Sequence, residues 1–126
     1  MVWSFRSADA REALSCCHQF LAAITDEAAL PVDTFASSLI YSELVTNVVY
    51  HAPGGIEISV DVEYNDAVLT VADEGPGFTL APSLPADVLA DRGRGLFLVS
   101  KFAKDVYAGT DDRGHHFVKA VLPRQM

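Results

Sequence analysis

Apolar residues recur along the 126-residue chain with two periods, one typical of helices and one typical of strands. After Ser7, a suitable N-cap, apolar residues follow one another at steps of three and four. The expected stripe consists of Ala10, Leu14, Cys17, Leu21, Ile24 and Ala28. The pattern predicts one long amphipathic helix that ends before Pro31.

A second helix is expected between a cap at Asp33 and the Ala-Pro-Gly-Gly sequence that follows His51. Its core-facing stripe is formed by Ile40, Leu44, Val45, Val48 and Val49. A third, shorter helix is expected to open at residues 93–95 and to continue through an apolar stretch that includes Val99.

A period of two identifies the strands. Residues 56–63 alternate apolar and polar side chains, and residues 67–72 return after a polar turn, which predicts a hairpin. Short strands are also expected at residues 2–5, 105–109 and 115–122, the first of them at a sheet edge. The order β-α-α-β-β-loop-α-β-β predicts an α+β fold. It is a two-layer sandwich in which a mixed, largely antiparallel sheet is covered on one face by three helices.

Length and charge narrow the functions open to this fold. The 126 residues are expected to form one domain. With 9 basic and 17 acidic residues, the net charge of −8 argues against binding to nucleic acid or an anionic membrane. A polyanionic ligand would need a metal ion or backbone donors. Without an apolar run of membrane-spanning length or a signal peptide, a cytoplasmic protein is expected, with Cys16 and Cys17 reduced in or near the core.

A polar stripe accompanies the apolar stripe of the second helix. Glu43, Asn47 and His51 are spaced four residues apart, so they fall on one side of the helix. Asn47 could offer a neutral oxygen to a Mg²⁺ that phosphates and water otherwise hold. Glu43, one turn earlier, could position or deprotonate a nucleophile. The alternative is a solvated polar face.

A second constellation begins at Asp73, at the end of an apolar strand. Gly75 and Gly77 follow it and would let a flat ligand approach the backbone closely. Asp73 could then accept a hydrogen bond from an exocyclic amine such as that of adenine, because a buried carboxylate left unpaired is costly. The alternative is an ordinary turn.

A third constellation opens the last predicted helix. Gly93 and Gly95 would expose the backbone N–H groups of the helix N-terminus, which suit phosphate oxygens. Arg92 and Arg94 could screen phosphate charge or could simply be solvated. The preceding loop, at about residues 79–92, is long enough to act as a lid.

Together, Glu-x-x-x-Asn, Asp-x-Gly-x-Gly and Gly-x-Gly, in that order, resemble the ATP-binding domain shared by gyrase, histidine kinases and MutL, known as the Bergerat or GHKL fold. The resemblance runs from about residue 35 to residue 123. The small size, the missing phosphoacceptor-helix domain, the short lid and Gly-Arg-Gly-Leu-Phe-Leu-Val are similar to the anti-sigma-factor serine kinases of bacterial partner-switching systems.

The resemblance implies that Glu43 is the general base, Asn47 the Mg²⁺ ligand and Asp73 the adenine anchor. It implies further nucleotide contacts from His51, Gly75, Gly77, Arg92, Gly93, Arg94, Gly95 and Leu96. Family members usually carry a Gly-Thr pair near the last strand, and here His115 stands in place of the threonine. His115 and His116 lack metal-site spacing and are expected to be structural.

Three functions are compatible with this resemblance. The first is an ATP- and Mg²⁺-dependent serine/threonine kinase and anti-sigma factor. It would phosphorylate a serine on a small STAS-type antagonist and hold a sigma factor away from RNA polymerase in its other partner state. The second is a non-catalytic module in which ATP orders the lid and sets partner affinity, although an intact Glu43 favours the kinase. The third is a stand-alone histidine-kinase-type ATPase domain, for which the sequence supplies no phosphoaccepting helix.

The resemblance also implies a homodimer formed through the sheet edge and the first helix. The apolar residues 2–5 suit such a contact, and an N-terminal strand packed under the core explains them equally well.

Overall fold

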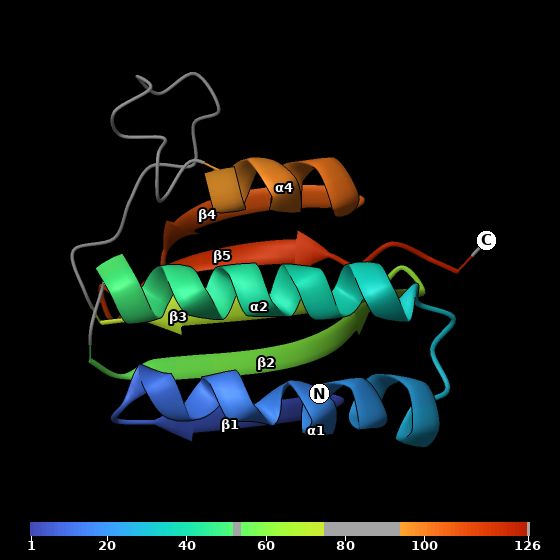
Figure 1. The fold of residues 1–126 in the computed structure, drawn as a ribbon, viewed down its shortest axis with the longest axis horizontal. Helices are drawn as coiled ribbons and strands as arrows, with labels where there is room; N and C mark the ends of the chain where they lie inside the picture. The colour runs from blue at the N-terminus through green and yellow to red at the C-terminus, as the bar shows by residue number, and fades with distance from the viewer. Residues whose placement is uncertain (52–53, 75–93, 126) are drawn as a thin grey trace.

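The computed structural model describes residues 1–51, 54–74 and 94–125, and its elements follow the predicted order (Figure 1). Five strands form one sheet in the order β1-β2-β3-β5-β4. Their bounds are Trp3–Ser7 for β1, Ile56–Glu63 for β2, Asp66–Asp73 for β3, Asp105–Thr110 for β4 and His116–Val121 for β5. All four pairings along this sheet are antiparallel. The α+β fold is confirmed, and β1 lies at a sheet edge as predicted.

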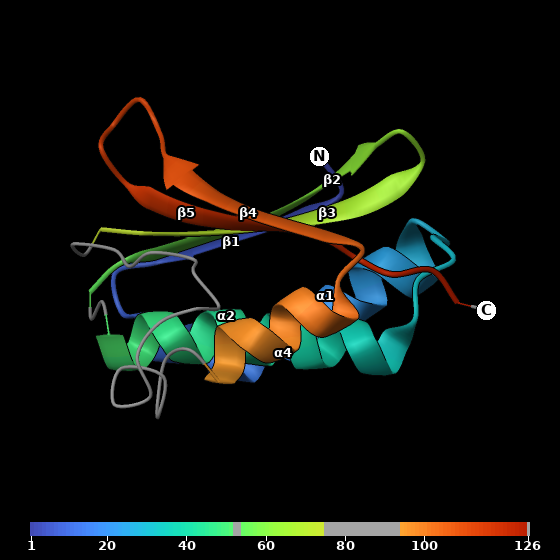
Figure 2. The same cartoon turned by 90° about the horizontal axis from the view of Figure 1, so that it is seen from above.

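The helices cover one face of the sheet and leave the other face open (Figure 2). Helix α2 (Thr34–His51) lies over the middle of the sheet, with α1 (Cys17–Ala22) and α4 (Arg94–Phe102) on either side (Figure 1). Alternation along the strands decides which side chains enter the core: Ile58 is buried against the helices, whereas its neighbours Glu57 and Ser59 are not. None of the helices within the described ranges is long and apolar enough to cross a membrane.

The first helical segment winds differently from its prediction. It consists of a 3₁₀ helix at Ala10–Cys16, the α-helix α1 and a π-helical turn at Ala23–Glu27. A 3₁₀ helix has three residues per turn, so the residues buried there are three apart, namely Ala10, Ala13 and Cys16. Leu14, which an α-helical stripe would bury, is 46% exposed. Both cysteines are free thiols, with Cys16 buried and Cys17 half-buried, as predicted.

Side-chain caps start the helical segments. Asp33 caps α2 as predicted, because its Oδ1 accepts the backbone N–H of Ala36 at 2.9 Å. The first segment is capped by Asp9 rather than Ser7: the Asp9 Oδ1 accepts the N–H of Arg11 at 3.0 Å, while Ser7 is the last residue of β1. The cap therefore lies two residues later than the sequence suggested.

A two-residue turn joins the central strands β2 and β3. Tyr64 and Asn65 both have positive φ angles, of 53° and 68°. Two such residues between paired strands follow the right-handed twist of a hairpin, and Glu63 and Asp66 pair directly on either side of them. The turn confirms the predicted hairpin and fixes its register.

Tyr41 is a core residue that links α2 to the first helical segment. Its hydroxyl donates to the backbone carbonyl of Ala13 at 2.8 Å, and its ring stacks on Phe20 with 4.8 Å between ring centroids. Trp3 of the edge strand lies 6.4 Å from the same ring. Burial raises the pKa of Tyr41, so its hydroxyl stays a neutral donor.

We expect Tyr41→Phe to destabilise the protein by about 1 kcal/mol, because the buried carbonyl of Ala13 loses a donor. Urea unfolding should show a lower midpoint with an unchanged slope. Tyr64→Phe is the matched control, since Tyr64 is 96% exposed and its hydroxyl should contribute nothing measurable. Equal midpoints for the two variants would show that the Tyr41 hydrogen bond is not stabilising.

Candidate functional site

Three polar or charged side chains are buried in the part of the chain that the structure describes, namely Ser37, Asn47 and Asp73. Burying such groups costs free energy unless a partner compensates for it. Two of the three, Asn47 and Asp73, are residues that the sequence selects as ligand contacts. Each is only 4% exposed.

Asn47 is a buried polar side chain whose amide group is not fully hydrogen-bonded within the described part of the chain. It lies on α2 one turn after the half-buried Glu43, and its Nδ2 is buried without a hydrogen-bond partner among the described residues. A carboxamide offers both an oxygen acceptor and N–H donors, so it suits a Mg²⁺ ion together with phosphate oxygens. Asn47 therefore fits a Mg²⁺-nucleotide. The described residues include no group of three His, Cys, Asp or Glu side chains that could hold a metal.

Asp73 is the last residue of β3, and the sheet places it at the rim. Its register neighbours are Ile56 on β2 and His116 on β5. Strand alternation puts Asp73 on the same side as the buried Val71, which faces the helices. The carboxylate therefore lies between the sheet and the helices.

The ends of three elements meet on one side of the molecule. The C-terminal end of α2, the end of β3 and the first residues of α4 all lie toward the left of Figure 1. Helix α4 packs along α2 and begins at Arg94, as predicted, so the backbone N–H groups of its first turn, which have no partner within the helix, face the same region. The backbones of His51, Gly95 and Leu96 belong to these helix ends. Gly75, Gly77, Arg92, Gly93 and the predicted lid at residues 79–92 lie outside the described residues.

His116 is a residue of this region that the sequence did not select. His116 on β5 pairs directly with Asp73 on β3. These two strands are far apart in the sequence, so the hydrophobic pattern alone does not predict that the two residues are neighbours. The adjacent His115 stabilises the turn between β4 and β5 instead. The backbone N–H of His115 donates to the Asp111 Oδ1 at 3.0 Å, and its carbonyl accepts the N–H of Asp111 at 2.9 Å.

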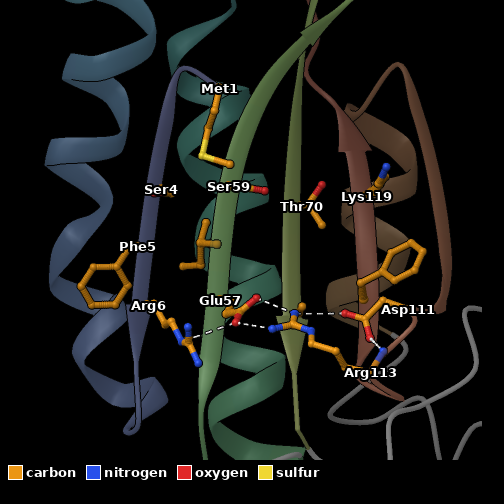
Figure 3. Close-up of a pocket in the computed structure, with 13 residues that line it drawn as sticks. Met1, Ser4, Phe5, Arg6, Glu57, Ser59, Thr70, Asp111, Arg113 and Lys119 are labelled. Carbon is orange, nitrogen blue, oxygen red and sulfur yellow. Dashed lines mark hydrogen bonds and ion pairs between the residues drawn. The ribbon is translucent and has the colours of Figure 1, made fainter.

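The open face of the sheet carries a second feature, a hollow of about 500 Å³ (Figure 3). The side chain of Arg113 lies across one end of this hollow. Its guanidinium donates two hydrogen bonds, of 2.8 Å and 2.7 Å, to the carboxylate of Glu57. Arg113 also pairs with Asp111 at 3.2 Å, and Arg6 approaches Glu57 to 3.4 Å. These cations, led by Arg113, lower the pKa of Glu57. This ion-pair cluster lies on the opposite side of the sheet from Asn47.

The sequence matches the family model of the histidine kinase-like ATPase domain over residues 6–118. The match spans most of the chain, and the protein therefore belongs to the histidine kinase-like ATPase family. It is an ATP-binding domain of the GHKL class, whose members usually bind ATP with Mg²⁺. This confirms the class that the sequence motifs indicate.

Solved structures agree on the fold. The catalytic domain of histidine kinase ThkA, in a nucleotide-free form, superimposes with a TM-score of 0.59 at 11% identity over 98% of each chain. The Acinetobacter baumannii histidine kinase AdeS gives a TM-score of 0.56 at 15% identity, over 100% of this chain and 70% of that one. No match was found among curated proteins. At these identities, the structural likeness establishes the fold alone.

Proposed function

We propose that the protein is a serine kinase that uses Mg-ATP, bound where α2, β3 and α4 meet. The observation that carries the proposal is the burial of Asn47 and Asp73 in a fold of the ATPase class. Glu43, one helical turn from Asn47, supplies a carboxylate that a purely binding module would not need. The Gly-Arg-Gly-Leu-Phe-Leu-Val sequence that leads into α4 supports the anti-sigma-factor kinase branch.

The proposed reaction moves one phosphoryl group. The substrate serine Oγ attacks the γ-phosphorus, Glu43 accepts its proton, and the bond from the γ-phosphorus to the β–γ bridging oxygen breaks to release ADP. Asp73 holds the adenine amine, while Asn47 and the N–H groups at the start of α4 hold the phosphate end. Mg²⁺, when bound, neutralises charge on the phosphates.

The proposed protein substrate is a small antagonist of the STAS type. In the other partner state, the same protein would hold a sigma factor, and a second copy of the chain would complete a homodimer. Phosphorylation adds a charge of about −1.5 to −2 to the antagonist, which is enough to change its contact with a kinase that itself carries a net charge of −8. This repulsion gives a physical basis for exchanging one partner for the other.

The test is a transfer assay with γ-labelled ATP, Mg²⁺ and a STAS-domain protein encoded beside the gene. We expect label on the antagonist that survives acid, as a serine phosphate ester does. Label that is lost in acid but kept in alkali would be a phosphohistidine and would support the histidine-kinase-type alternative. ATP binding without any transfer would support the non-catalytic module.

A further inference from the structure

One row of residues crosses the sheet at the rim where the nucleotide is proposed to bind. Successive strands contribute Ser7, Ile56, Asp73, His116 and Thr110 to it. Two residues further along β3 and β5, Val71 and Val118 pair with each other and are buried beneath the helices. Since alternate residues of a strand share a face, Asp73 and His116 also lie on the helix-covered side. Residues directly opposite each other have Cβ atoms about 4.5–5.5 Å apart.

The surroundings of Asp73 favour a role for this neighbour. On its other side stands Ile56, which is 2% exposed and offers no side-chain hydrogen bond. A carboxylate has two oxygens with room for several donors, and one adenine amine occupies only part of that capacity. A carboxylate can therefore accept from more than one donor, and the half-buried His116 carries an imidazole N–H at the position directly opposite Asp73 in the sheet.

The two adjacent histidines occupy different environments. His115 precedes β5, is tied to Asp111 through its backbone, and lies near enough to Glu57 to contribute to lowering the pKa of that carboxyl. Arg113 anchors the same hairpin to β2 through Glu57, which holds the start of β5 in register. These contacts fix the backbone at the start of β5 and so keep His116 directly opposite Asp73.

We propose that His116 is a positioning residue for Asp73 and thereby sets the selectivity of the site for adenine. Its imidazole N–H donates to one oxygen of the Asp73 carboxylate and orients the group, so that the other oxygen accepts the exocyclic amine of the base. This inference rests on the proposed nucleotide site. It adds to that site a second side chain, one that acts on the base through Asp73.

The experiment compares two nucleotides on the full chain by calorimetry. Mg-ATP carries the exocyclic amine, and Mg-purine riboside triphosphate lacks it. A hydrogen bond to a charged group corresponds to a preference for ATP of roughly 10- to 100-fold in the wild type. His116→Leu should reduce this preference to a few-fold, and His116→Asn, which keeps a neutral N–H donor, should restore most of it. His115→Leu is the matched control and should keep the wild-type preference.

The outcomes separate this inference from the proposed function. No ATP binding by the wild type would overturn both. Binding of ATP with a preference that His116→Leu and His116→Asn both retain would overturn the positioning role and leave the nucleotide site standing. Equal loss of the preference in the His115 and His116 variants would also overturn the role, because it would trace the effect to the hairpin as a whole. His116→Asn keeps the test decisive if the leucine variant does not fold.

Discussion

Replacing Asn47 by alanine is expected to weaken Mg-ATP binding by more than about 100-fold while leaving the fold intact. Altering even an outer-shell partner of a bound metal typically costs 10- to 100-fold in affinity, and Asn47 is proposed to contact the ion directly. The fold should tolerate the change, because the variant removes a buried Nδ2 that has no partner among the described residues. Binding and stability should therefore separate cleanly at this position.

The measurement is calorimetric titration with ATP, with Mg²⁺ present and then removed by a chelator. Ser37→Ala is the matched control: Ser37 lies on the same helix, is 0% exposed, and its Oγ likewise has no partner among the described residues. It precedes Asn47 by about 15 Å of helix, so its loss should not affect the nucleotide. Unchanged binding by Asn47→Ala, or an equal loss in both variants, would contradict the assignment.

Glu43→Gln is expected to slow phosphoryl transfer by about 10²- to 10⁴-fold and to change the affinity for Mg-ATP by no more than a few-fold. The amide keeps the size of the side chain and cannot accept the proton of the attacking hydroxyl. A carboxylate that acts only during transfer lowers the rate without changing ground-state binding.

Single-turnover transfer to the antagonist, with enzyme in excess, isolates this step from product release. Glu27→Gln, which changes an exposed carboxylate on the π-helical turn, is the control and should retain full activity. Normal turnover by Glu43→Gln would exclude Glu43 as the proton acceptor. Parallel loss of binding and transfer would place Glu43 in the nucleotide contact instead.

Much of the fold follows from local patterns. The alternation over residues 56–63, the polar turn after it and the stripe of Ile40, Leu44 and Val48 lead directly to β2, the hairpin and α2. The winding of the first helical segment does not follow, because Ala13 and Leu14 are both apolar and the larger of the two, Leu14, is the one that stays exposed. Only the backbone hydrogen-bond pattern decides which of them enters the core.

The candidate site, like the fold, has one part that local sequence patterns predict and another that depends on contacts between distant segments. Residue type and spacing select Glu43, Asn47 and Asp73, since each stands at a recognisable place on a helix or at a strand end. The burial of Asn47 depends on what packs over α2, and polar spacing alone is equally consistent with a solvated face. The pairing of His116 with Asp73 depends on β5 joining β3, a contact between segments distant in sequence.

The two-residue turn at Tyr64 and Asn65 has a consequence for how the protein folds. It joins β2 and β3 by a shorter connection than any other pair of neighbouring strands in the sheet, so their pairing closes the shortest loop and is expected to form early. β1 and β5 then add on either side, and β4 completes the far edge. Asp73 ends this early hairpin, but the row around it is complete only when β5 has docked. ATP would then bind the fully assembled sheet in preference to earlier states and stabilise the last step of folding.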